Sequence, residues 1–210
     1  MTIDFLGISL QSYSWQTVLG SSISGVFLGS IYALVALGLT LIYGVLHIIN
    51  FAHGSLLMLA MYAVFFLWNI LGLDPYLSML IVVPGGYLFG YTLQRTIIGK
   101  ASHGKDEITL LVMLGVSIVM ENTALFFFTA TDRSVRVPYD LDGFDLGVTY
   151  VVYPEIAALL GSLLITLVLW FFMSYTDTGK AIRAVSKERQ GARLVGINVE
   201  HIFAVSFGIG

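Results

Sequence analysis

The class of fold is decided by the stretch ISGVFLGSIYALVALGLTLIYGVL, residues 23–46, in which no side chain carries a formal charge. It lies inside a longer charge-free segment that runs from Phe5 to Leu73. An α-helix needs about 20 consecutive apolar residues to cross the hydrocarbon core of a bilayer. Residues 23–46 therefore predict a membrane-spanning helix.

The composition of the whole chain supports a membrane protein. The 210 residues are 57% hydrophobic and only 11% charged, with a mean hydropathy of +0.88, whereas soluble domains usually carry about 25% charged residues. The net charge of −3 gives no support for binding to nucleic acid. The chain contains no cysteine, which excludes disulfides, thiol catalysis and cysteine-based metal sites.

Other apolar segments of similar length follow residues 23–46. Together they predict an all-α, polytopic transmembrane helical bundle. We expect this bundle to form one domain over residues 1–210. The predicted spans cover residues 23–46, 48–71, 75–98, 108–129 and 152–175. The segment from Phe5 to Leu19 is too short for a span and is predicted to be an interfacial or partly inserted helix. A further span starts at residues 201–210, so we expect the chain to be truncated at the C-terminus, as a fragment or as the product of a truncated or split gene.

The basic residues predict the orientation. Eight of the ten lie in two loops: Arg95, Lys100 and Lys105, and then Lys180, Arg183, Lys187, Arg189 and Arg193. The positive-inside rule places both loops in the cytoplasm. The loop over residues 130–150, which contains four aspartates, is then outside.

A polar stretch, HIINFAHGS at residues 47–55, interrupts the charge-free segment. On a helix, His47, Asn50 and His53 would spread over about 120°. A metal site is disfavoured because no carboxylate lies in the segment. Two interpretations stay open: a polar break whose donors satisfy backbone carbonyls, or polar groups that face a water-filled path. Glu121 is a lone acid in the fourth span. It either pairs with a neighbouring polar group or lines a path.

Small residues predict how the spans pack. The pairs Gly25/Gly29 and Gly86/Gly90 each place two glycines on one helix face, where they let neighbouring backbones approach closely. The third span contains the stretch Pro84-Gly85-Gly86, which predicts a kink or a break.

The basic segment after the fifth span, residues 176–200, predicts a short amphipathic helix. It runs from about Lys180 to Leu194, with basic residues on one face and alanine and valine on another, and Gly196 ends it. A helix that rests on lipid uses bulky anchors such as Trp, Phe and Leu. The small apolar residues here favour docking into a groove of another protein.

Two motifs together identify a family. The run GSIYALVALGLTLIYG at residues 29–44, followed by INFAHG at 49–54, resembles the permease subunit of bacterial branched-chain amino acid ABC importers. The segments TGKAIRAV at 178–185 and ARLVGIN at 192–198 are similar to the coupling loop of the same family. The resemblance covers nearly the whole chain, although members of the family continue well beyond the coupling loop.

The resemblance implies a transport subunit in the bacterial inner membrane that is multi-pass, contains no catalytic residue and needs no cofactor. It implies pairing with a second permease subunit, docking of two cytoplasmic ATPase subunits, and delivery of substrate by a periplasmic binding protein near Asp140–Asp145. The chain has no phosphate-binding loop of its own. The predicted ATPase-coupling residues are Gly179, Ala181, Arg183, Ala184, Glu188, Ala192 and Gly196. The candidate residues of the translocation path are Asn50, His53 and Glu121.

Other functions stay open at this point. Related permeases handle urea, short amides or sugars, and the two motifs do not separate these substrates well. A secondary transporter or channel that works alone would need ion-coupling groups, for which Glu121 and the two histidines are the candidates. An inactive remnant is the third possibility.

Overall fold

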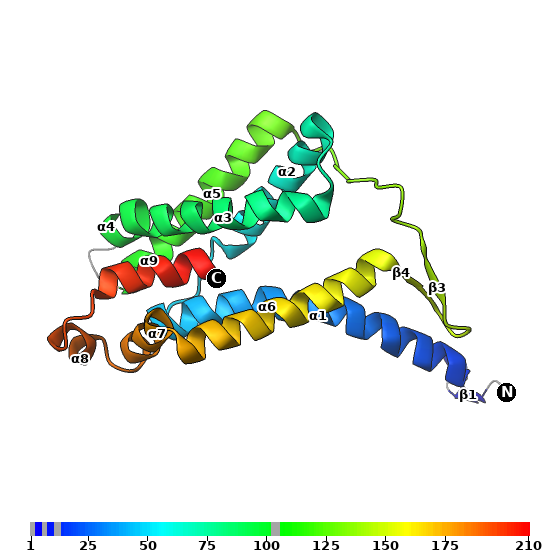
Figure 1. Cartoon of the computed structure of the whole chain (residues 1–210). Helices are drawn as coiled ribbons and strands as arrows, with labels where there is room; N and C mark the ends of the chain where they lie inside the picture. The colour runs from blue at the N-terminus through cyan, green and yellow to red at the C-terminus, as the bar shows by residue number, and fades with distance from the viewer. Residues whose placement is uncertain (1–2, 6–7, 11–13, 102–105) are drawn as a thin grey trace. The chain divides into compact units, whose positions relative to one another are not determined.

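The structure is a computed structural model that describes residues 3–5, 8–10, 14–101 and 106–210 (Figure 1). It is almost entirely helical, which confirms the predicted class. The helices are α1 (Trp15–Leu46), α2 (His53–Leu71), α3 (Pro75–Leu93), the π-helix η1 (Gln94–Ile98), α4 (Gly99–Ala101), α5 (Asp106–Phe128), α6 (Tyr153–Tyr175), α7 (Asp177–Lys187), α8 (Arg189–Leu194) and α9 (Val199–Ile209). Two short antiparallel pairs join β1 (Ile3–Phe5) to β2 (Ile8–Leu10) and β3 (Gly143–Asp145) to β4 (Tyr150–Val152).

Five helices of the described residues are long and apolar enough to cross a membrane, as the sequence predicts. They are Trp15–Leu46, His53–Leu71, Pro75–Ala101, Glu107–Phe128 and Tyr153–Tyr175. The shorter α9 is also apolar.

The N-terminal segment differs from the prediction. Helix α1 begins at Trp15 rather than at residue 23, so residues 15–19 are its first turns and do not belong to a separate helix over residues 5–19. The hydroxyl of Ser14 accepts a hydrogen bond from the Thr17 N–H at 3.3 Å and caps this early start. Before it, Ile3–Phe5 and Ile8–Leu10 are strands, while residues 6–7 and 11–13 lie outside the described residues.

The chain divides into two compact units. The first comprises residues 1–34 and 138–167, and the second residues 35–137 and 168–210. In the first, the β3–β4 hairpin turns at Gly147, which has a φ of +74°. The hairpin packs against α1, where a Cβ added to Gly20 would lie 3.1 Å from the Val148 carbonyl oxygen. A single domain over residues 1–210 stays a prediction.

The second unit holds the hydrophobic core. Helix α3 packs against both α2 and α9, and α2 packs against α5. Helices α7 and α8 both contact α9. The core side chains are Ile42, Val45, Leu46, Ile48, Leu93, Ile98, Met113, Ile182, Val185, Ala192, Val199, Ile202, Val205 and Phe207. The basic segment after α6 therefore contributes to the same core as the apolar helices.

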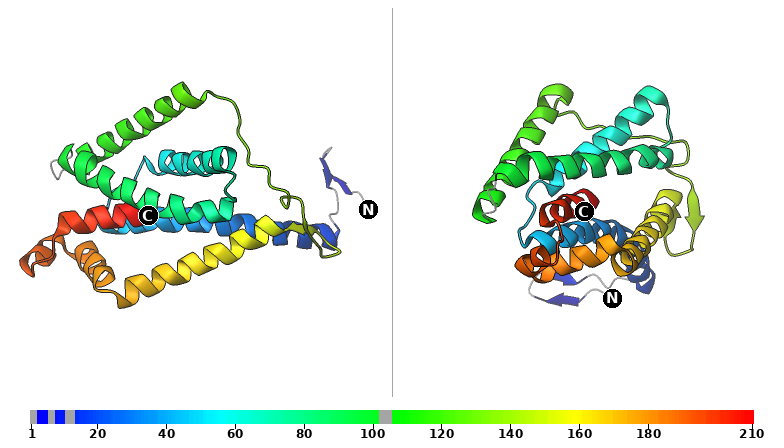
Figure 2. Two further views of the ribbon diagram at one scale, coloured as in Figure 1. Left: turned by 45° about the horizontal axis from the view of Figure 1, so that its top comes forward. Right: turned by 60° about the vertical axis from the view of Figure 1, so that its left-hand side comes forward.

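Helices α3 and α9 lie side by side in this core (Figure 2). A Cβ added to Gly90 would lie 3.2 Å from both the Gly208 Cα and the Phe207 carbonyl oxygen. A Cβ added to Gly208 would lie 2.7 Å from the Tyr87 carbonyl oxygen. The two backbones approach this closely because both positions lack a side chain. Four glycines were predicted to lie on packing faces: Gly25, Gly29, Gly86 and Gly90. Among the described residues, an added Cβ would lie within 4 Å of another part of the chain only at Gly90.

Helix α3 continues through Pro84, so the predicted break at residues 84–86 is not present. Proline removes one backbone hydrogen bond, and transmembrane helices tolerate this loss when neighbouring groups satisfy the freed carbonyl. The irregular turn lies further on, where α3 widens into the π-helix at Gln94–Ile98. The π-helix ends at Gly99, whose N–H donates to the Gln94 carbonyl.

The close contact between α3 and α9 predicts different effects at two glycines of the same helix. We expect Gly90→Val to lower the free energy of unfolding by about 1–3 kcal/mol, because the new side chain would meet the α9 backbone. Gly86→Val, one turn earlier and in open space, is the matched control and should change stability by less than about 1 kcal/mol. Thermal unfolding of both variants in detergent measures the difference. Equal melting temperatures would contradict the contact.

Candidate functional site

The polar stretch at residues 47–55 forms the break between α1 and α2. Helix α1 ends at Leu46, and His47 has a φ of +58°, so the backbone leaves the helix there. The side-chain oxygen of Asn50, which is only 3% exposed, accepts a hydrogen bond from the Ala52 N–H at 3.0 Å. The Asn50 carbonyl accepts one from the His53 N–H at 3.2 Å. Because residues 47–52 are not helical, the predicted helical arrangement of His47, Asn50 and His53 is wrong.

The Asn50 side chain therefore satisfies one backbone N–H within the break, whereas the structural interpretation of this stretch expected donors that satisfy backbone carbonyls. The amide nitrogen of the same side chain is buried and has no hydrogen-bond partner in the described structure. Buried amide groups normally have partners, so this nitrogen is a donor that remains available. A role in a translocation path stays a prediction.

His53, by contrast, is the first residue of α2 and is half-buried. Its ring lies against the last part of α1, since a Cβ added to Gly38 would be 3.4 Å from the His53 Cε1. The Gly38 position also contacts Gly210, next to the end of α9. His53 thus lies where the last part of α1 meets α2 and α9.

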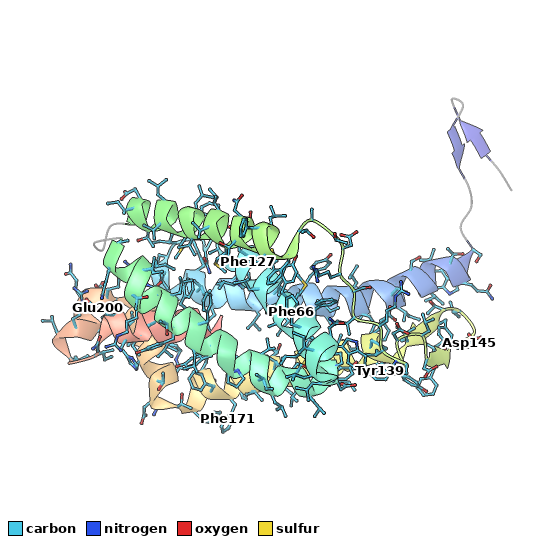
Figure 3. The ribbon with its side chains drawn as sticks, turned by 90° about the horizontal axis from the view of Figure 1, so that it is seen from above. Phe66, Phe127, Tyr139, Asp145, Phe171 and Glu200 are labelled. Atoms are coloured by element: carbon cyan, nitrogen blue, oxygen red, sulfur yellow. The ribbon has the colours of Figure 1, made fainter. Side chains whose placement is uncertain are left out.

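Glu121 is not isolated, because it contacts two hydroxyls. Its Oε1 accepts from the Ser55 hydroxyl at 2.8 Å and from the Ser117 hydroxyl at 2.9 Å. The two serine oxygens are 2.6 Å apart, and both serines are buried. Ser55 belongs to the first turn of α2, and Ser117 lies one turn before Glu121 on α5. The three side chains form a polar cluster that joins α2 to α5, two helices on which Phe66 and Phe127 are marked in Figure 3.

The structure brings Glu121 to the first turn of the helix that His53 begins, although the two residues are far apart in sequence. The sequence prediction included Glu121 but missed both serines. Ser117 could have been found, because residues four apart lie on the same face of a helix. Ser55 could not have been assigned to Glu121 by any local pattern.

The basic segment after α6 forms two helices, so the predicted single helix from Lys180 to Leu194 is wrong. Helix α7 begins at Asp177, where the Thr176 hydroxyl caps it by accepting from the Gly179 N–H at 3.0 Å. Glu188 then adopts an extended conformation, with φ −154° and ψ 104°. Its carboxylate accepts from the Gln190 N–H at 3.2 Å and so caps α8. Gly196, with a φ of +87°, follows α8 and confirms the predicted stop.

The seven predicted coupling residues differ in exposure. Gly179 and Ala192 are buried, Ala181 and Ala184 are half-buried, and Arg183, Glu188 and Gly196 are exposed. Gly179 packs against the end of α6, since an added Cβ would lie 2.6 Å from the Met173 carbonyl oxygen. The guanidinium of Arg183 donates to the same carbonyl. These two residues hold α7 against the end of α6, and their role in coupling stays a prediction.

The predicted coupling residues do not include two exposed apolar side chains at the end of α8. Leu194 is 88% exposed and Val195 is 76% exposed, although both belong to the motif ARLVGIN. They add little to the stability of the chain itself, because they are hardly buried.

Arg189 connects this segment to the break between α1 and α2. Its guanidinium donates to the Leu46 carbonyl at the end of α1 and lies 3.5 Å from the His47 Nδ1. It also lies over the Phe203 ring, 5.2 Å from the ring centre. One side chain therefore links α8 to α1 and to α9.

A family model and individual known proteins both match the chain, and both are branched-chain amino acid transport permeases. A family model described as "Branched-chain amino acid transport system / permease component" matches residues 21–210. The chain is similar to the high-affinity branched-chain amino acid transport system permease protein BraD of Pseudomonas aeruginosa, with 30% identity over 202 residues. It is also similar to the permease proteins named LivH of the same kind of system, with 30% identity over 206 residues in Salmonella typhimurium and 29% over 204 residues in Escherichia coli K12.

These alignments cover 90% of this chain for BraD and 89% for each LivH. The chain spans 65% of the length of each of the three relatives. No solved structure matches the chain with statistical significance.

The cluster of Ser55, Ser117 and Glu121 predicts a measurable contribution to stability. We expect Ser55→Ala to lower the free energy of unfolding by about 1–2 kcal/mol, because the change removes a hydrogen bond to a charged group between two helices. Ser162→Ala is the matched control, since this buried hydroxyl donates only to the Leu159 carbonyl of its own helix. Chemical or thermal unfolding in detergent compares the two. The cluster would be of no consequence if Ser55→Ala were as stable as Ser162→Ala.

Proposed function

The chain belongs to the family of branched-chain amino acid transport system permease components, and from that premise we propose that it forms part of the membrane path of an ATP-driven importer for branched-chain amino acids. The observation that carries this proposal is the extent of the family match, which begins within the first membrane-spanning candidate and includes the other four and the basic segment after them. The names of the similar bacterial proteins support the substrate class.

We place the protein in the bacterial inner membrane as a multi-pass subunit. Its basic loops face the cytoplasm, in keeping with the positive-inside rule. A second homologous permease subunit pairs with it, and a periplasmic binding protein delivers substrate to the acidic loop on the opposite side. ATP is hydrolysed by two partner subunits in the cytoplasm, so the chain itself is not an enzyme.

The polar side chains at the start of α2 are our candidates for the path. His53 begins this helix, and the cluster of Ser55, Ser117 and Glu121 lies at its first turn. The free amide nitrogen of Asn50 precedes them. Polar and ionisable groups at membrane depth are costly and are commonly found along substrate or ion pathways. Donors and a carboxylate in one place can bind the two charged groups of an amino acid.

The surface of α7 and α8 is our candidate for ATPase docking. The exposed Leu194 and Val195 supply apolar contact area, and the exposed Arg183 and Glu188 supply charge. Because α7 and α8 belong to the same core as α9, and Arg189 reaches the end of α1, a displacement of these helices moves the start of the path. The contacts give docking a direct route to the transmembrane helices.

Uptake by cells tests the substrate class. We expect deletion of the gene to lower uptake of radiolabelled leucine, isoleucine and valine at low concentration by more than tenfold, and the wild-type gene to restore it. His53→Ala, expressed at the wild-type level, should restore less than half of this uptake. Uptake of labelled urea and of a labelled sugar serves as the control for related permeases. Loss of urea or sugar uptake with unchanged amino acid uptake would assign the protein to another substrate.

Co-purification tests the docking surface. We expect Leu194→Ser with Val195→Ser to reduce the ATPase subunits recovered with the tagged protein from native membranes by at least tenfold, since the apolar contact is lost. The melting temperature should stay unchanged, because neither side chain is buried. Leu141→Ser is the matched control, as Leu141 is 78% exposed in the acidic loop. Unchanged recovery of the ATPases would place docking elsewhere, and their absence from the wild-type sample would count against the importer.

A further inference from the structure

A pocket of about 430 Å³ lies beside the end of α1, between the break that follows it and helices α7 and α8. Its volume is in the range of small-molecule sites. The lining includes His47 from the break and Lys187, Glu188, Arg189, Gln190 and Arg193 from the basic segment. The candidate path does not include this pocket, and the proposed docking surface shares only Glu188 with it.

The lining is strongly cationic. It contains three basic side chains and one carboxylate, which gives a formal charge of +2 with His47 neutral. The carboxylate of Glu188 already accepts the Gln190 N–H that caps α8. A lining of net positive charge attracts an anion.

The three basic side chains differ in how firmly their positions are fixed. Arg189 is fixed by its hydrogen bond to the Leu46 carbonyl and by its position over the Phe203 ring. Lys187 and Arg193 are exposed and form no ion pair among the described residues, where the one ion pair joins Lys180 to Asp177. A fixed guanidinium flanked by two adjustable cations is suited to an oxyanion with several oxygen atoms, because each cation can contact a different oxygen.

The location of the pocket points to the source of the anion. Leu46 ends a helix that is long and apolar enough to span a membrane, so the adjacent pocket lies at the level where such a helix leaves the hydrocarbon core. Phospholipid phosphates lie at this depth, and basic pockets beside membrane helices on the cytoplasmic side bind anionic head groups. The two basic loops place this end of α1 on the cytoplasmic side.

We propose that this pocket binds a phosphate group, supplied by the head group of an anionic phospholipid. Lys187 and Arg193 contact the phosphate oxygens, and Arg189 orients the group through its fixed guanidinium. A bound head group would join α7 and α8 to the end of α1, since the lining comes from both. The proposal does not depend on which substrate the protein carries.

The melting temperature of the detergent-solubilised chain tests the proposal. The chain is mixed with micelles that contain phosphatidylglycerol, phosphatidylcholine or no lipid, and separately with inorganic phosphate in lipid-free micelles. At a saturating concentration we expect phosphatidylglycerol to raise the melting temperature by about 5–10 °C, with no comparable change in phosphatidylcholine. The variant Lys187→Gln with Arg193→Gln should lose this shift. Lys180→Gln, which removes an exposed lysine of α7 outside the pocket, should keep it.

The outcomes separate the sources of phosphate. An equal shift with inorganic phosphate that also requires Lys187 and Arg193 would support the phosphate site and assign it to a soluble anion. The proposal is overturned if neither anion shifts the melting temperature, or if the double variant keeps the full shift. Should the double variant not fold, the two single variants replace it. Each is then expected to lose about half of the shift, and a full shift in both overturns the proposal.

Discussion

Backbone groups that lie away from water must find hydrogen-bond partners within the protein, and this constraint accounts for much of the structure. Long helices meet it along their length. It becomes difficult only where a helix ends, as at the break between α1 and α2. There the Leu46 carbonyl accepts from Arg189, and the Ala52 N–H donates to Asn50. Within the polar stretch, Asn50 therefore has a role toward the backbone that is separate from any role in transport.

The same constraint explains why the candidate sites lie close to one another. The break ends at His53, and Ser55, in the first turn of the helix that follows, reaches Ser117 and Glu121 on α5. The guanidinium that satisfies the end of α1 comes from α8, within the proposed docking segment. The polar groups of the proposed path and the segment proposed to meet the ATPases thus adjoin the same break in the backbone. This proximity gives the proposed coupling a short physical route.

The sequence predicts the features that depend on apolar length and local composition. Five helices of membrane-spanning length follow from it, as do the polar break and the stop at Gly196. Two local expectations were wrong: a break at residues 84–86 is absent because α3 continues through Pro84, and Glu188 caps a second helix where one helix was expected. Both depend on whether a nearby group supplies a hydrogen bond, which composition does not reveal. Two partners could not be predicted, Arg189 for the Leu46 carbonyl and Ser55 for Glu121, because each lies more than 60 residues away in sequence.

The hydrogen bond between Arg189 and Leu46 joins residues that are 143 positions apart. Ribosomes add about 5–20 residues per second, so the carbonyl at the end of α1 exists for roughly 7–30 s before its partner is made. During that interval water or lipid head groups must solvate it. The hydrogen bond between Arg189 and the end of the first span can therefore form only after the basic segment has been synthesised. Order of synthesis, and not only sequence, determines when this part of the protein becomes native.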